Sequence, residues 1–198
     1  MTSEVQIAKL ALQHLGDRYD ITSLNEATPE AEQVNLIFSD IRDQVLRSHP
    51  WKFAVKHTSP TVLAGTVPAN WDYMFTYPAD ALKILHVVNP LGRTASPIHF
   101  DVFRNAANVK VVVCDEEEPE FKYISQVTDT AQFDPSFVTA FSLRLAYHLA
   151  IPLTGDRGLM RDLKLLADEA MSEAARESAN EGVEDARTRD PDWITARA

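Results

Sequence analysis

The sequence has few of the residues from which common catalytic and metal sites are built. Its 198 residues include one cysteine, Cys114, and six glycines. One cysteine excludes an intrachain disulfide and favours a reducing compartment. The glycines form no P-loop, no GxGxxG motif and no GxSxG motif, and the six histidines form no HExxH pair. We therefore predict no catalytic residues, no cofactor and no bound metal.

Positive charge and long apolar runs are also scarce. The chain has 19 Lys and Arg against 29 Asp and Glu, so its formal net charge is −10 and its pI is near 5.0. This balance argues against a sequence-independent DNA clamp and against docking on anionic lipid. The first residues lack the basic stretch and apolar run of a secretory signal. The longest near-apolar run, around residues 145–151, is far shorter than the roughly 18 residues of a membrane span.

Hydrophobic periodicity predicts two helices in the first quarter of the chain. Apolar residues recur at helical spacing over residues 4–15, and Gly16 follows as a natural stop. Thr28 is a suitable N-cap for a second helix that starts at Pro29 and runs to about Ser48. The apolar stripe of this second helix consists of Ala31, Val34, Phe38, Ile41 and Val45.

The middle of the chain changes to strand-like alternation. We predict short strands at residues 51–55, 73–77, 83–88, 98–103, 108–113 and 121–127, with a proline-rich loop at 59–72. The last two strands are expected to form a hairpin across the acidic turn CDEEEPE. The aromatic segment 71–77 contains no basic residue, which favours core packing over stacking on nucleic-acid bases.

Two further helices are predicted after residue 134. The first begins at Pro135, is apolar nearly all round, and ends at Pro152 and Gly155. The second runs from about Asp156 to Arg187, and its second half has too little apolar surface to dock on its own core. We expect that half to project into solvent or to lie against another subunit. The predicted apolar stripe of its first half consists of Leu159, Leu163, Leu166 and Ala170.

These elements predict an α+β fold that is mainly α. Neither pair of helices closes a core alone, so burying both stripes requires the two pairs to pack together. We predict a four-helix bundle formed by residues 1–50 and 133–190, a small antiparallel β-rich insertion at 51–132 between helices 2 and 3, and a long C-terminal helix. A polar C-terminal tail follows at 188–198.

Four features are candidates for a chemical or binding role. His148 lies in the apolar helix, where a hydrogen-bonded core histidine is favoured over a catalytic one. Arg144, one turn earlier, either pairs with a carboxylate, snorkels at the bundle end or contacts a partner. Neighbouring carboxylates should raise the pKa of Cys114 and make it a poor nucleophile. The acidic run at 115–118 favours a solvated turn over a metal site or a glycosidase carboxylate pair, and a partner contact or channel-facing surface stays open.

Five stretches, in order along nearly the whole chain, resemble a known family. The chain resembles the head-to-tail adaptor proteins of short-tailed bacteriophages, the tail tubular protein A family. The stretches are AKLALQHLG with ITSLNE, IRDQVLRSHPWKFA, WDYMFTYPADALKI, YISQVTDTAQFDPSFVTAFSLRLAYHLAIPLTGD and DPDWITAR.

The resemblance implies a structural virion protein, made in the host cytoplasm, that forms a ring between the portal protein and the tail nozzle protein. The ring is usually a dodecamer, and genomic DNA passes through it without specific binding. Twelve copies would carry a formal charge of about −120, which repels DNA phosphates. We expect Trp193, Ile194 and Arg197 to dock on the portal. Channel or nozzle surface is expected at Asp115, Glu116, Glu117 and Glu118.

Three other functions stay open at this point. A tail-completion or terminator protein of a long-tailed phage would share the ring but meet a different partner. A virion-associated hydrolase of peptidoglycan or polysaccharide would need two carboxylates within about 10 Å of each other, facing a groove. A host-interaction or regulatory module would form no ring.

Overall fold

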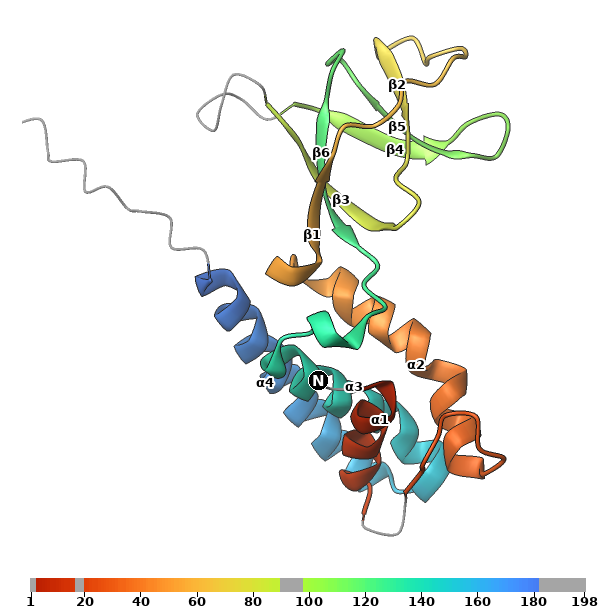
Figure 1. Ribbon diagram of the computed structural model, residues 1–198, viewed down its shortest axis with the longest axis vertical. Coiled ribbons are helices and arrows are strands. Elements are labelled where there is room, and N and C mark those ends of the chain that lie inside the picture. Colours follow the sequence, from red (N-terminus) through yellow and green to blue (C-terminus); the bar gives the residue numbers. More distant parts are fainter. Residues whose placement is uncertain (1–2, 17–19, 90–97, 182–198) are drawn as a thin grey trace, which may run out of the picture.

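The computed structural model shows an elongated molecule with a helical half and a β-sheet half (Figure 1). It describes residues 3–16, 20–89 and 98–181. Four α-helices are present in these ranges, and two small antiparallel three-stranded sheets lie between the second and third helices in the chain. The predicted α+β class and the place of the β-rich segment are therefore confirmed.

The first two helices form close to their predicted positions because their ends are capped. α1 spans Glu4–Gln13, and Ser3 and Gln6 form a capping box at its start. It ends two residues before the predicted position because the backbone N–H of Leu15 bonds the carbonyl of Leu12 in a tighter turn. α2 spans Pro29–Ser48, and the Thr28 hydroxyl accepts a hydrogen bond from the third helical N–H. The predicted apolar stripe of α2 is buried.

The third helix, α3, spans Pro135–Thr154 and is buried on most sides, as its sequence predicts. Pro152 does not end it but lies in its last turn, and the helix closes at Gly155 in the left-handed conformation with φ 70°. By length and composition α3 could span a membrane, which the shorter apolar run at 145–151 did not predict. However, 56% of its apolar stretch is buried inside the protein, as in the core helix of a folded domain.

The fourth helix, α4, spans Arg157–Asn180 and packs along α3. The prediction that its second half cannot dock on its own core is wrong for the described part. Ala174 and Ser178 are 1% and 4% exposed, and the Ser178 hydroxyl accepts a hydrogen bond from the backbone N–H of Lys52 at 3.0 Å. Small side chains let two helices approach closely, so alanine and serine suffice for this contact. The predicted extension to Arg187 passes beyond the described residues.

Helices from the two ends of the chain share one hydrophobic core, as predicted. α1, α2 and α4 all pack against α3. An aromatic cluster fills the end of this core that lies nearest the sheets. The ring of Phe137 lies 5.0 Å from that of Trp51 and 6.0 Å from that of Phe141, and the ring of Phe38 packs edge-on against Phe141.

The β half consists of two sheets that face each other across a second core. One sheet has the order β1(Val55–Thr58), β6(Glu120–Ser125), β3(Ala81–Val88), and the other has the order β2(Tyr73–Thr76), β5(Lys110–Cys114), β4(Phe100–Arg104). Phe75 and Phe121 meet edge-on between the sheets at 5.9 Å. The loop at 59–72 covers the other face of β5 with Leu63, Val67 and Trp71.

Two predictions about the strands are wrong. β5 and β6 do not form a hairpin, because β5 already bonds β2 and β4 on its two edges, while β6 bonds β1 and β3. The acidic turn therefore carries the chain from one sheet to the other. The predicted strand at 51–55 begins only at Val55. Lys52–Ala54 is a short 3₁₀ helix, since Trp51 turns into the helical core and its indole N–H donates to the carbonyl of Val45.

Candidate assembly surfaces

The predicted acidic surface lies at the end of the molecule farthest from the helices (Figure 1). Asp115, Glu117 and Glu118 are exposed and Glu116 is partly exposed, as a solvated turn requires. Asp115 Oδ1 accepts the backbone N–H of Asp72 at 3.2 Å, which fixes the start of the turn. None of the four carboxylates forms an ion pair with another residue of the described ranges.

The turn changes the acidity of two neighbouring side chains. Burial raises the pKa of the Cys114 thiol, and the charges of Asp115 and Glu116 raise it further. The predicted direction is confirmed, although burial is the larger cause. The carboxylate of Glu117 raises the pKa of Tyr73, with smaller contributions from burial and other acids. Both groups are therefore neutral near pH 7.

The candidate portal-docking residues Trp193, Ile194 and Arg197 lie outside the described residues. Their predicted role stays a prediction.

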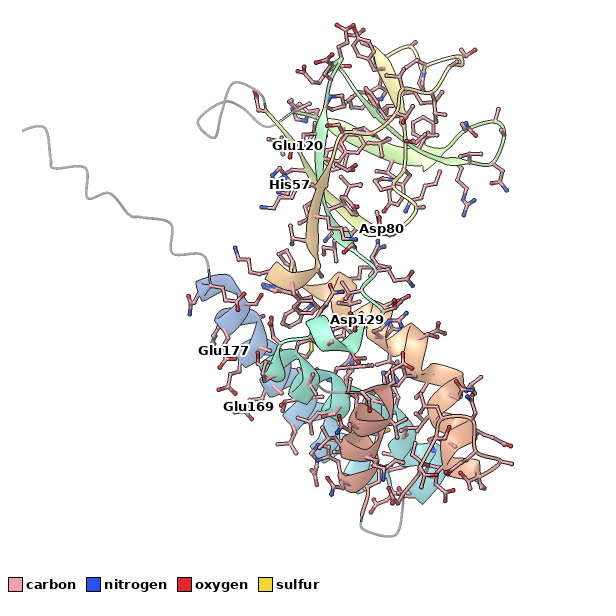
Figure 2. The ribbon with its side chains drawn as sticks, in the orientation of Figure 1. His57, Asp80, Glu120, Asp129, Glu169 and Glu177 are labelled. Atoms are coloured by element: carbon pink, nitrogen blue, oxygen red, sulfur yellow. The ribbon has the colours of Figure 1, made fainter. Side chains whose placement is uncertain are left out.

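A second candidate surface is the outer side of α4, which the periodicity misassigned. Leu165 and Leu166 are 69% and 50% exposed, although Leu166 was expected in the buried stripe. Leu163 faces the core as predicted, and Ala167 is buried where Leu166 was expected. Leu165 lies two residues before Ala167, about 200° around the helix, and so it points away from α3. In Figure 2 the side chains of Glu169 and Glu177 also point away from the core. The sequence did contain one sign of this exposed surface. Leu165 and Leu166 are adjacent on a helix, so they cannot both face the core.

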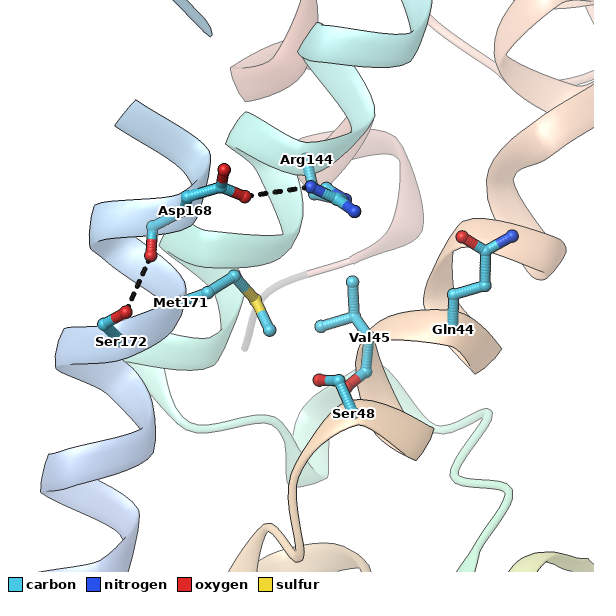
Figure 3. Close-up of a pocket in the computed structure, with 7 residues that line it drawn as sticks. All are labelled: Gln44, Val45, Ser48, Arg144, Asp168, Met171 and Ser172. Carbon is cyan, nitrogen blue, oxygen red and sulfur yellow. Dashed lines mark hydrogen bonds and ion pairs between the residues drawn. The ribbon is translucent and has the colours of Figure 1, made fainter. Parts of the chain in front are cut away.

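A pocket of about 300 Å³ opens between α2 and α4, and Arg144 of α3 is among its lining residues (Figure 3). Arg144 Nη1 lies 3.2 Å from Asp168 Oδ1, and Lys164 Nζ lies 2.8 Å from Asp168 Oδ2. Of the alternatives given for Arg144, pairing with a carboxylate is the one that the structure shows. The hydroxyls of Ser48 and Ser172 donate to carbonyls of their own helices, at 2.6 and 2.9 Å, and so neither is held by a general base.

His148, one turn after Arg144, corrects a further prediction. It is partly buried, and its Nε2 atom has no hydrogen-bond partner among the described residues, whereas a hydrogen-bonded histidine was expected. Its ring lies against Tyr147, 4.7 Å between centroids. Burial lowers the pKa of His148, and the charge of Arg144 lowers it further. An unpaired nitrogen costs less in a neutral ring than in a charged one, because burying a charge without a partner costs more.

A third surface was not found from the sequence. On the outer side of the β1–β6–β3 sheet, Lys122 lies directly opposite His57 on one neighbouring strand and His86 on the other. His57 Nδ1 lies 2.7 Å from Glu120 Oε1, and Figure 2 shows this pair on one side of the β half. Burial lowers the pKa of His86, with smaller contributions from Lys122 and His57. Only the strand register brings these residues together.

Within the described ranges, no group of three or more His, Cys, Asp and Glu side chains is placed to hold a metal ion. No protein-family model matches the chain, and no curated protein matches it. The surfaces above are therefore interpreted from their own chemistry.

Proposed function

We propose that the chain is a structural virion protein, a head-to-tail adaptor of a short-tailed bacteriophage. In this proposal copies of the chain form a ring between the portal protein and the tail nozzle. The ring surrounds the channel through which DNA leaves the capsid, and the chain performs no catalysis. The sequence resemblance suggests the family, and two features of the structure support the proposal.

The observation that carries the proposal is the outer side of α4. Leu165 and Leu166 expose large apolar side chains on the longest helix, on the side that α3 leaves free. Burying a leucine side chain contributes roughly 2 kcal/mol relative to leaving it in water. Several copies placed side by side would gain this at every contact. In a ring the contact joins two different patches, and it closes by rotation.

The distribution of charge supports the same reading. The acidic turn lies at one end of an elongated molecule, and the chain as a whole carries −10. An excess of carboxylates around a channel repels DNA phosphates, so that DNA moves without adhering. We assign the end of the molecule that carries Asp115–Glu118 to the channel or nozzle side of the ring, and the net charge of −10 on the whole chain supplies the repulsion.

The first test is assembly on the portal protein encoded by the same genome. Full-length chain mixed with portal should give a particle with a ring of adaptor copies, seen by electron microscopy. Leu165→Glu with Leu166→Glu should abolish the ring while the monomer stays folded. Leu36→Glu is the matched control, because Leu36 is 68% exposed on α2 and should be neutral. Ring formation by the double variant, or none by the native chain, would refute the proposal.

The second test concerns the tail. A chain that ends at Arg187 lacks Trp193, Ile194 and Arg197, and it should lose affinity for the portal. Virions that assemble and retain DNA with this shortened chain would refute the docking assignment. A ring that forms on a tail tube and not on a portal would instead identify a tail-completion protein.

A further inference from the structure

One face of the β half is positively charged in an otherwise acidic chain. The outer side of the β1–β6–β3 sheet presents His57, Lys83, His86 and Lys122, with Glu120 as an acidic neighbour. We call this set of residues the histidine face. Neighbouring strands lie about 4.8 Å apart, so the row from His57 through Lys122 to His86 is roughly 10 Å long.

The acidic turn has the complementary charge. It presents four consecutive carboxylates, Asp115 to Glu118, and none of them is neutralised by an ion pair within the described residues. Like charges so close together repel one another, and a cationic surface that meets them removes this cost. The turn projects from the end of the molecule, where another copy can reach it (Figure 1).

We propose that the histidine face of one copy receives the Asp115–Glu118 turn of a second copy. This inference rests on the proposed function, which requires copies to meet side by side. The two surfaces are different patches of one chain, so the contact is heterologous, as a closed ring requires. It adds a polar, salt-sensitive contact between the β halves to the apolar contact through α4.

The turn does not pair with the histidine face of its own copy within the described residues. Residues Glu120–Ser125 form the extended strand β6, which leads directly from the turn. The strand places Lys122 roughly 13 Å along the chain from Glu118, at about 3.3 Å per residue. Lys83 and Lys122 form no ion pair within the described residues, so their charges can meet those of a neighbouring chain.

A second copy fits the face better than DNA does. The face has two lysines and two histidines, and one of these, His57, is already paired with Glu120. Duplex DNA presents a charge every 1.7 Å or so, and binding usually engages six to ten phosphates. The remaining surface of a −10 chain would repel the duplex beyond the face. A short turn of four carboxylates has the size and the charge to meet Lys83 and Lys122.

The contact should tighten in acidic solution. Among the described residues, Glu120 and Lys122 on β6 are the charged groups beside His86, and His57 faces His86 across β6. Protonation of His86, whose pKa is lowered chiefly by burial, adds positive charge to the face. Four carboxylates brought by a second copy favour that protonated state.

The test uses charge reversal in the full-length chain with the portal. The face variant combines Lys83→Glu with Lys122→Glu, and the turn variant combines Glu117→Lys with Glu118→Lys. Each alone should need at least about tenfold more protein to form rings, because like charges meet at every contact. An equal mixture of the two variants should restore assembly, since each then meets a neighbour of opposite charge. Glu32→Lys with Asp40→Lys on α2 makes the same change in net charge as the turn variant and is its control.

Chemical cross-linking gives an independent readout. A zero-length carbodiimide reagent joins a lysine amine to a carboxylate, and it should link Lys122 to the Glu117–Glu118 peptide between isotopically labelled and unlabelled native copies. Native rings without this cross-link, or variants that assemble normally or are not rescued by mixing, overturn the inference and leave the proposed function intact. If the native chain binds a 30-base-pair DNA duplex and the face variant does not, while rings form normally, the face is a DNA contact. That result also overturns the inference. Native chain that forms no ring overturns both proposals.

Discussion

In the helical half, Trp51, Phe137 and Phe141 join segments from both ends of the chain into one large core. In the β half, two smaller cores lie on the two faces of β5, and a loop closes one of them. The helical half therefore derives its stability from contacts between distant segments. The cores of the β half are smaller, and its strands present charged residues such as Lys83 and Lys122 on their outer side. The difference separates a part that holds the molecule together from a part that offers polar surface.

The largest effect is expected from Phe137→Ala in the helical half. Phe137 is fully buried, and its ring meets those of Trp51, Phe53, Phe133 and Phe141. Removing it leaves a cavity that four aromatic neighbours cannot fill, which should lower the free energy of unfolding by about 3–5 kcal/mol. Urea denaturation followed by tryptophan fluorescence measures this change. A loss below about 1 kcal/mol would contradict the assignment of the main core.

Phe121→Ala tests the core of the β half in the same way. Phe121 is fully buried between the two sheets, so its loss should cost about 3 kcal/mol, felt mainly in the β half. Hydrogen exchange should then show faster exchange in β3, β5 and β6 while α2, α3 and α4 keep their protection. Equal loss of protection in both halves would show that they unfold as one unit.

We expect the β half to lose stability at high pH because Tyr123 ionises there. Burial and the hydrogen bond to Asp80 raise the pKa of Tyr123 to about 12. A raised pKa means that the folded state favours the neutral phenol, so this contribution is complete below pH 10 and is lost as pH rises through 12. It amounts to about 3 kcal/mol, at roughly 1.4 kcal/mol for each unit by which the pKa is raised. Between pH 9 and pH 12 the free energy of unfolding of the native chain should therefore fall more than that of Tyr123→Phe. Urea denaturation at several pH values measures both, and an equal fall in the two chains would contradict this.

The smallest effect is expected from the residues that precede two helices, Asp156 before α4 and Asp134 before α3. Asp156 accepts hydrogen bonds from the backbone N–H groups of Gly158 and Leu159, at 2.7 and 3.1 Å, whereas the Asp134 side chain caps no N–H of α3. Asp156→Ala should cost about 1 kcal/mol of unfolding free energy. Asp134→Ala is the matched control and should cost little, because burial and Glu181 already raise the pKa of Asp134. Thermal unfolding of both variants decides this, and equal losses would contradict the capping geometry.

The same contrast explains how much of the fold could be predicted. Helix positions follow from local signals: Thr28 and Pro29 start α2, and Gly155 ends α3. Strand pairing depends on contacts between distant segments, and a short turn between two strands does not show which edges are occupied. The run Val111–Val113 was a usable signal, since three consecutive buried β-branched residues are typical of a central strand covered on both faces.

The candidate surfaces divide in the same way. The exposed acidic turn could be read from consecutive carboxylates, because local charge density alone keeps such a segment in water. The outward side of α4 required knowing that Ala167, and not Leu166, faces α3. The histidine face required the register of three strands that lie apart in the sequence, so no local pattern could reveal it.

In the proposed function, the outer side of α4 joins copies of the chain into a ring on the portal. Cryo-electron microscopy of the full-length chain bound to its portal tests this most directly. We expect a closed ring in which Leu165 and Leu166 are buried against the neighbouring copy. Isolated monomers on the portal, or a ring in which both leucines stay in solvent, would contradict it.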